Sequence, residues 1–90
     1  MGTSRPFYLS EFTNIILDKK PKKILDIGPG FGKNGFLCRE FTDIWNHNYK
    51  KEFWKTTIDC VEIFPDYITN VHREVYSNII IDDAFKYLER

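Results

Sequence analysis

The chain of 90 residues is poor in cysteine, has no excess of charge of either sign and has no long hydrophobic run. Neither of its two cysteines, Cys38 and Cys60, has a partner at metal-ligand spacing, so no metal site is expected. No apolar stretch approaches the length that crosses a membrane, and the N-terminus does not resemble a signal peptide. We therefore expect a cytoplasmic protein with buried, unpaired cysteines and no membrane partner.

The balance of thirteen basic and thirteen acidic residues argues against a dedicated nucleic-acid surface, which usually carries a basic excess. Four lysines cluster between residues 19 and 23, and lysines alternate with aromatic residues between 46 and 54. The cluster is typical of a solvated connection near a helix end. Nucleic-acid binding by segment 46–54 is the less favoured alternative, so nucleic acid is not indicated as a partner.

The hydrophobic pattern predicts one domain, residues 1–90, in which helices and strands alternate. Strands are expected at 23–27, 57–64 and 78–82, and helices at 7–19, 33–45, 66–76 and 85–90. This order, a lead-in helix followed by β-α-β-α-β-α, predicts an α/β fold with a parallel sheet. Strand 23–27 is apolar on both faces, so we expect helices to cover both of its sides.

Two apolar faces and several solvent-exposed side chains are predicted within the helices. Residues Leu9, Phe12, Ile15 and Ile16 share one face of the first helix, and Leu37, Phe41, Ile44 and Trp45 share one face of the second. We expect Glu40, Asp43, His47 and His72 to be exposed to solvent. The long connection 46–57 is expected to be anchored by Phe53 and Trp54.

Four of the five glycines lie between residues 28 and 35, directly after the first predicted strand. A strand, a glycine turn and a helix together bring backbone N–H groups close to a ligand. In parallel sheets, ligands bind beyond the carboxyl ends of the strands. Asp26, Glu62 and the pair Asp82-Asp83 end three successive strands, so we expect one ligand site at this edge of the sheet.

The residue types at the strand ends suit a nucleoside. The Glu62 carboxylate can accept hydrogen bonds from both hydroxyls of a ribose, and Asp83 can accept one from an exocyclic amine. Ile63, Phe64 and Ala84 are placed to enclose a flat base. Three residues also have an alternative interpretation, in which they do not contact the ligand. In that interpretation Asp26 accepts hydrogen bonds from turn amides, Phe31 covers the core, and Asp82 caps the last helix.

The glycines fit two patterns. Gly30, Gly32 and Gly35 match the dinucleotide pattern G-x-G-x-x-G, whereas the segment 26–32 matches acid-x-G-x-G-x-G. The second pattern begins at the end of the strand, where the turn must begin. Its acid, Asp26, suits an ammonium group better than a pyrophosphate. The second pattern therefore favours S-adenosylmethionine as the cofactor, and NAD(P) is the alternative.

With these motifs the chain resembles the class I S-adenosylmethionine-dependent methyltransferases. Segment 26–32 is similar to their first motif, 61–64 to the acid of their second strand, and 81–84 to their third-strand Gly-Asp-Ala motif, with Asp82 in place of glycine. The resemblance implies a three-layer, Rossmann-like fold with helices on both faces of the sheet. It also implies that the cofactor contacts Asp26, Gly28, Pro29, Gly30, Phe31, Gly32, Glu62, Ile63, Phe64, Asp83 and Ala84.

The resemblance implies a domain built on a seven-stranded sheet of strand order 3-2-1-4-5-7-6. This chain resembles only the first half of such a domain, with strand order 3-2-1. The resemblance thus implies the cofactor-binding half of an enzyme that methylates an unknown acceptor. The catalytic residues and the acceptor site are expected in the second half, so the fragment alone should be inactive. The alternatives are a non-catalytic S-adenosylmethionine-binding module and an NAD(P)-binding oxidoreductase fragment. The uncovered edge of strand 23–27 is expected to promote self-association.

Overall fold

The computed structural model describes residues 8–89, which form alternating helices and strands. The elements are α1 (Leu9–Lys19), β1 (Lys23–Ile27), α2 (Lys33–Arg39), η2 (Glu40–Ile44, a π-helix), η3 (Lys51–Phe53), β2 (Thr57–Glu62), η4 (Pro65–Tyr67), α3 (Asn70–Val75), β3 (Asn78–Ile81) and α4 (Ala84–Leu88). The predicted order of elements is confirmed, although the second strand is shorter than expected. The ends of two predicted helices, Phe7 and Arg90, lie outside the described residues.

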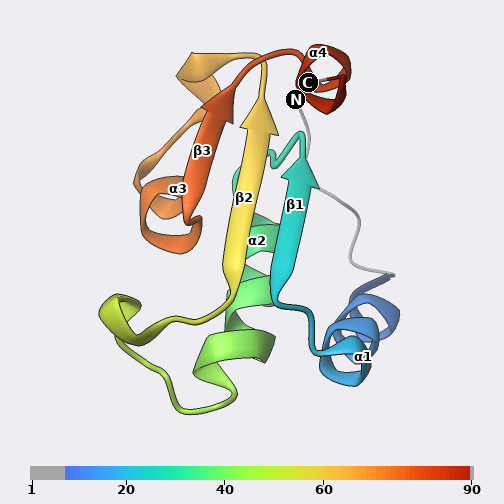
Figure 1. Cartoon of the computed structure of the whole chain (residues 1–90), viewed down its shortest axis with the longest axis vertical. Coiled ribbons are helices and arrows are strands. Elements are labelled where there is room, and N and C mark those ends of the chain that lie inside the picture. The colour runs from blue at the N-terminus through green and yellow to red at the C-terminus, as the bar shows by residue number, and fades with distance from the viewer. Residues whose placement is uncertain (1–7, 90) are drawn as a thin grey trace.

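The three strands form one parallel sheet in which β2 lies between β1 and β3, as Figure 1 shows. Ile24 pairs with Ile58, and Cys60 pairs with Ile79. Because side chains alternate across a strand, this register places Ile24, Ile58, Cys60 and Ile79 on the same face. The predicted α/β class with a parallel sheet is confirmed.

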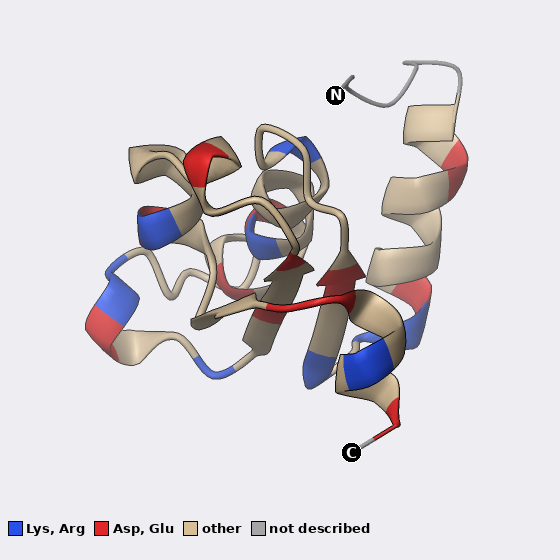
Figure 2. Cartoon of the chain, turned by 90° about the horizontal axis from the view of Figure 1, so that it is seen from above, with Lys and Arg blue, Asp and Glu red and all other residues tan. Residues whose placement is uncertain are grey.

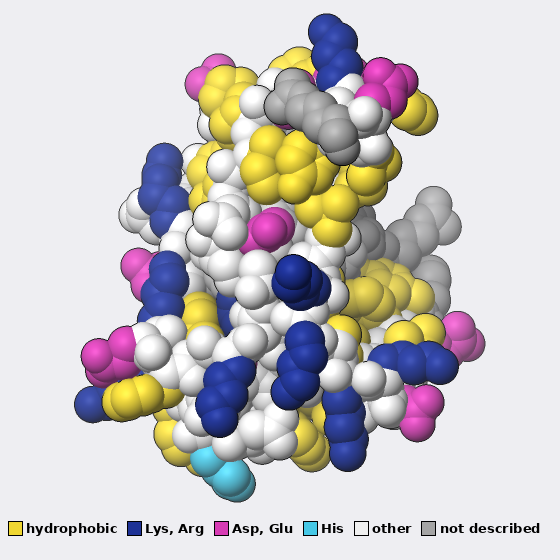
Figure 3. Space-filling model, in the orientation of Figure 1, with side chains coloured by type: hydrophobic (Ala, Val, Ile, Leu, Met, Phe, Trp, Pro, Cys, Tyr) yellow, Lys and Arg dark blue, Asp and Glu magenta, His cyan; other side chains and the backbone are white. Residues whose placement is uncertain are grey.

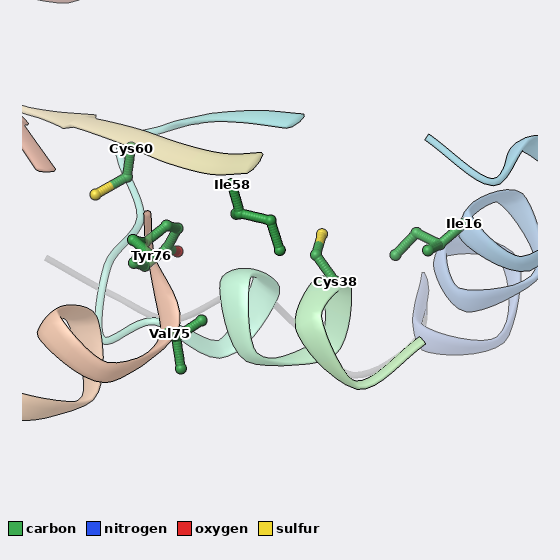
Figure 4. Close-up of a cluster of buried hydrophobic side chains, with 6 residues drawn as sticks. All are labelled: Ile16, Cys38, Ile58, Cys60, Val75 and Tyr76. Carbon is green, nitrogen blue, oxygen red and sulfur yellow. The ribbon is translucent and has the colours of Figure 1, made fainter. Parts of the chain in front are cut away.

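This face of the sheet packs against helices and forms the hydrophobic core. Ile58 and Cys60 of β2 meet Cys38 of α2 and Val75 of α3, with Tyr76 between them (Figure 4). Ile16 of α1 closes one end of the cluster. Both cysteines are buried and unpaired, as expected. The core therefore lies on the side of the sheet that α2 covers in Figure 1.

The opposite face of the sheet is only partly covered, so the prediction that helices flank β1 on both sides is wrong. Leu25 is 39% exposed and Ile27 50% exposed. The element on this side is α4, which has five residues and contacts β2 (Figure 2). Val61 on this face of β2 is buried. The five-residue helix α4 therefore leaves the β1 side chains on this face partly exposed.

The buried side of the second helix also differs from the prediction. Cys38, Arg39, Thr42 and Asp43 are buried, whereas Trp45 is 57% exposed. The exposure of Trp45 follows from the π-helix η2, in which the Trp45 N–H donates to the Glu40 carbonyl at 2.8 Å. A π-turn adds a residue and rotates the following side chains away from the face that an α-helix would present. Ile15 of α1, also expected on a buried face, is exposed.

A buried ion pair anchors the long connection between η2 and β2. The Arg39 Nη1 atom lies 2.7 Å from Asp43 Oδ2 and donates to the Thr56 carbonyl at 2.6 Å. Asp43 also accepts hydrogen bonds from the backbone N–H groups of Lys55 and Thr56 at 2.7 and 3.1 Å. The Arg39 guanidinium lies 4.1 Å from the centroid of the Trp54 ring. Trp54 is thus an anchor as predicted, whereas Phe53 is 59% exposed. The expectation of a solvated Asp43 is wrong, because its side chain is buried.

Candidate functional site

The carboxyl ends of the three strands meet at one edge of the sheet, and the sequence-predicted site residues lie along it. Viewed from above in Figure 2, acidic residues occupy the ends of the strands and the segment that follows β3. Two backbone hydrogen bonds join the strand ends: Gly28 N–H donates to Val61 O and Asp82 N–H donates to Glu62 O, both at 3.0 Å. The glycine turn, Glu62 and the Asp82–Asp83 pair therefore belong to one continuous rim.

The glycine turn begins at Gly28 with left-handed backbone geometry. Gly28, Gly30 and Gly32 have φ values of 66°, 61° and 95°, which other residues rarely adopt. A Cβ atom on Gly28 would have no described atom within 4 Å. Glycine is thus required at position 28 by its left-handed backbone conformation and not by close packing. The space beside Gly28 is open to a ligand.

Gly35 is required for a different reason, because a tyrosine ring occupies the place of its side chain. A Cβ atom on Gly35 would lie 2.6 Å from Tyr76 Cε1 and closer still to Cζ and Oη. Gly35 has ordinary helical geometry within α2. It therefore allows α2 and the segment after α3 to approach closely.

The same tyrosine holds Asp26. The Tyr76 hydroxyl donates to Asp26 Oδ2 at 2.5 Å. Burial raises the pKa of Asp26 above its usual 3.8, and the hydrogen bond from Tyr76 opposes this effect. No cationic side chain of the described residues lies within 4.0 Å of this carboxylate. Asp26 is thus a half-buried acid that has a hydroxyl partner and no counter-ion.

His72, which we expected in solvent, is fully buried beneath the glycine turn. Its Nδ1 accepts a hydrogen bond from the Thr69 N–H at 2.9 Å, and its Nε2 lies 2.7 Å from the Gly30 carbonyl oxygen. Because Nδ1 accepts and the Gly30 carbonyl can only accept, Nε2 is the ring nitrogen that donates to Gly30. His72 therefore links α3 to the middle of the glycine turn.

His72 in α3 and Tyr76, the residue that caps the end of α3, thus both support the site. The rings of His72 and Tyr76 are stacked, with centroids 6.0 Å apart and planes 17° apart. A sequence signal for His72 existed, because it stands three residues after the helix-capping Thr69 and completes a capping box. The prediction missed this because the capping residue at that position is usually Glu or Gln. No pattern pointed to the contact between Tyr76 and Asp26.

Glu62 ends β2 with its side chain on the core face, the same face as Asp26 on β1. It is buried, and its Oε2 accepts a hydrogen bond from the Phe64 N–H at 3.0 Å. Among the described residues, Oε1 has no hydrogen-bond partner. The backbone bond therefore fixes the carboxylate while one oxygen remains available.

Asp83, and not Asp82, caps the last helix. The Asp83 Oδ1 atom accepts hydrogen bonds from the N–H groups of Phe85 and Lys86 at 2.9 and 3.2 Å. Asp82 Oδ1 accepts from the Asp83 N–H at 2.8 Å. The alternative in which Asp82 is the helix cap is thus wrong. Asp83 retains its second oxygen for another donor.

Apolar side chains surround the rim without closing it. Phe31 is 57% exposed, so it does not cover the core, and Ile63 and Phe64 are also about half exposed. Pro29 is buried in the turn and Ala84 is half-buried at the start of α4. The edge therefore has open apolar surface on both sides of its acidic groups.

No protein-family model matches the chain, and no curated protein is significantly similar to it. Between residues 8 and 89, no three His, Cys, Asp or Glu side chains are grouped so as to hold a metal ion. No helix in this range has the length and apolar character needed to cross a membrane. The class of ligand must therefore be argued from the geometry of the rim.

Proposed function

We propose that the chain is the cofactor-binding half of a class I S-adenosylmethionine-dependent methyltransferase domain. The observation that carries the proposal is the meeting of Asp26, the glycine turn, Glu62 and Asp83 at the carboxyl edge of one parallel sheet. Ligands of open α/β sheets bind at this edge. The three strands would then correspond to the first three of a seven-stranded, Rossmann-like domain.

The backbone of the turn supports the methyltransferase pattern over the dinucleotide pattern. The three glycines with left-handed geometry are Gly28, Gly30 and Gly32, which are the glycines of acid-x-G-x-G-x-G. Gly35, the last glycine of the alternative pattern, is helical and packs against Tyr76. The turn thus begins at Gly28, one residue beyond β1, and leaves Asp26 adjacent to the bound ligand.

The charges at the rim also suit this cofactor. Asp26 has no counter-ion among residues 8–89, and the ammonium group of S-adenosylmethionine would supply one. The available oxygen of Glu62 can accept from ribose hydroxyls, and the second oxygen of Asp83 can accept from the adenine amine. A pyrophosphate at the turn would instead place two negative charges near Asp26.

Calorimetric titration of the chain with S-adenosylhomocysteine and, separately, with NAD tests the proposal. We expect heat of binding with S-adenosylhomocysteine only. Glu62→Gln should weaken this binding about tenfold or more, because it replaces a charge-assisted hydrogen bond with a neutral one. Glu11→Gln, an exposed acid on α1, is the matched control and should bind as the parent chain does. Binding of NAD without binding of S-adenosylhomocysteine would exclude the methyltransferase assignment.

The acceptor and the groups that act on it would belong to the second half of the domain. Methyl transfer is an in-line displacement that depends mainly on positioning, so the 90-residue chain should bind the cofactor without turnover. A methylation assay with the complete gene product distinguishes an enzyme from a non-catalytic binding module. Persistent cofactor binding with no methylation of any acceptor class would favour the module.

The uncovered β1 edge supports the accompanying expectation of self-association. Within residues 8–89, β1 has a paired neighbour on one side only, and Leu25 and Ile27 expose apolar surface on the adjacent face. Exposed apolar edges of sheets tend to pair with other chains. Sedimentation equilibrium should show dimers or larger species. Leu25→Lys should shift the distribution toward monomer, and a parent chain that stays monomeric at high concentration would contradict the expectation.

A further inference from the structure

A second candidate site lies at the opposite end of the sheet from the glycine turn. A cleft of about 640 Å³ opens between the α1–β1 connection, the π-helix η2 and the segment 46–56. Its walls include Lys20, Lys22, Trp45, Asn46, Asn48 and Lys55. These residues come from three separate segments, so only the folded chain brings them together.

The cleft is strongly basic although the chain as a whole is neutral. Three lysines line it, and the one acid in its wall, Asp43, is already paired with Arg39. Among the described residues, none of these lysines has a carboxylate within 4.0 Å. Segments 19–23 and 46–56 together hold seven lysines and one glutamate, a net charge of +6, so the rest of the chain carries −6. Figure 3 shows most of the visible Lys and Arg side chains over the lower half of the molecule.

Irregular backbone geometry is concentrated around the same cleft. Lys20 and His47 have φ values of 47° and 69°, and they are the two non-glycine residues with positive φ in the part of the chain that the structure describes. Lys20 lines the cleft, and His47 lies between Asn46 and Asn48. The π-helix η2 supplies a third irregular segment. Such geometry costs free energy and is frequent at functional sites.

We propose that this cleft binds a single-stranded nucleic acid. Lys20, Lys22 and Lys55 would neutralise successive phosphates, which is the main source of affinity for such chains. Trp45 borders the lysines and is 57% exposed, so its ring can stack on a base. The Asn46 Nδ2 atom already donates to the Thr42 carbonyl at 2.7 Å, so its Oδ1 atom and the Asn48 amide are the groups that can bond to base edges or sugars. A concave, polar wall favours a flexible strand over a flat bilayer. This binding is independent of the cofactor site, so the two proposals can fail separately.

Fluorescence anisotropy with a labelled oligothymidylate of about ten nucleotides, titrated with the 90-residue chain at several salt concentrations, tests the proposal. We expect binding that weakens as salt rises. The double variant Lys22→Gln/Lys55→Gln should lower the slope of log affinity against log salt by about 1.4, because each phosphate contact of a single strand contributes about 0.7. The control Arg73→Gln/Lys86→Gln removes the same charge from exposed positions away from the cleft. It should bind within about twofold of the parent chain.

Stacking is tested by Trp45→Leu, which should lose about tenfold in affinity without losing the salt dependence. Circular dichroism establishes that each variant is folded, since Trp45 also packs against Phe41. The proposal is overturned if the oligonucleotide does not bind at low salt. It is equally overturned if the control pair weakens binding as much as the cleft pair. Binding to phosphatidylserine vesicles without binding to the oligonucleotide would assign the cleft to a membrane surface instead.

Discussion

Replacing Tyr76 with Phe isolates the hydrogen bond that holds Asp26. The ring would still fill the space over Gly35 and stack on His72, and one oxygen atom would be lost. Asp26 would then be a half-buried carboxylate without the hydroxyl that donates to it at 2.5 Å. Leaving such a group unsatisfied costs about 1–3 kcal/mol. We therefore expect the free energy of unfolding to fall by about that amount at neutral pH.

The cost of Tyr76→Phe should depend on pH. Burial raises the pKa of Asp26 above its usual 3.8, and the Tyr76 bond lowers it, so the substitution should raise this pKa further. A carboxyl group whose pKa is higher in the folded chain than in the unfolded chain destabilises the fold when it is ionised. This penalty is absent at a pH below the pKa of the group in the unfolded chain. The destabilisation should thus be small near pH 3.8, grow as the pH rises through the folded pKa, and be largest at neutral pH.

Urea denaturation followed by tryptophan fluorescence measures this effect at pH 7 and at the lowest pH at which the chain folds. Asp26→Asn should raise the unfolding midpoint at pH 7, because it removes an acid whose ionised form burial disfavours. In the Asp26→Asn background, Tyr76→Phe should cost less than in the parent chain. The reasoning is refuted if Tyr76→Phe costs the same free energy of unfolding at both pH values. It is also refuted if the effects of Tyr76→Phe and Asp26→Asn add within about 0.5 kcal/mol.

Three further predictions concern packing, the buried ion pair and the thiols. Gly35→Ala should lower stability by about 1–3 kcal/mol, because its methyl group would overlap the tyrosine ring; an unchanged urea midpoint would contradict this. Arg39→Met should cost about 3–5 kcal/mol, because it leaves a buried carboxylate without its partner, and thermal unfolding followed by circular dichroism measures the loss. Burial raises the pKa values of Cys38 and Cys60 to about 12. Both thiols should therefore react with a thiol reagent at pH 8 only as fast as the chain unfolds. Rapid modification of the native chain would show instead that the thiols are accessible.

The sequence predicted the elements well because each is bounded by a strong local signal. β1 has the bounds that its apolar run predicts between Pro21 and Gly28, and β3 ends within one residue of its prediction. The faces of the helices were predicted less well. Arg39 is buried because it donates to the carbonyls of Thr56, just before β2, and of Val75, at the end of α3, and no local pattern reveals these partners. The π-helix at Glu40–Ile44 also has no local sequence signal.

In the candidate cofactor site, too, residues with a local sequence signal could be predicted, and residues that depend on distant partners could not. Asp26, Glu62 and Asp83 could be placed at one edge because parallel strands end on the same side of a sheet. His72 and Tyr76 could not, because their roles arise from contacts with Gly30 and Asp26, which lie 42 and 50 residues away in the sequence. A histidine among polar neighbours on a short helix gives no local sign that it is fully buried.

The sequence by itself determined the alternation of strands and helices, the glycine turn and the acids at the strand ends, since these follow from periodicity and from the backbone needs of glycine. The tertiary structure decided which groups those acids meet, which face of the sheet stays open and where the lysines gather. The physical reason is that charge and burial depend on distances in space. A chain with no net charge can therefore fold with an acidic rim at one end of its sheet and a basic cleft at the other.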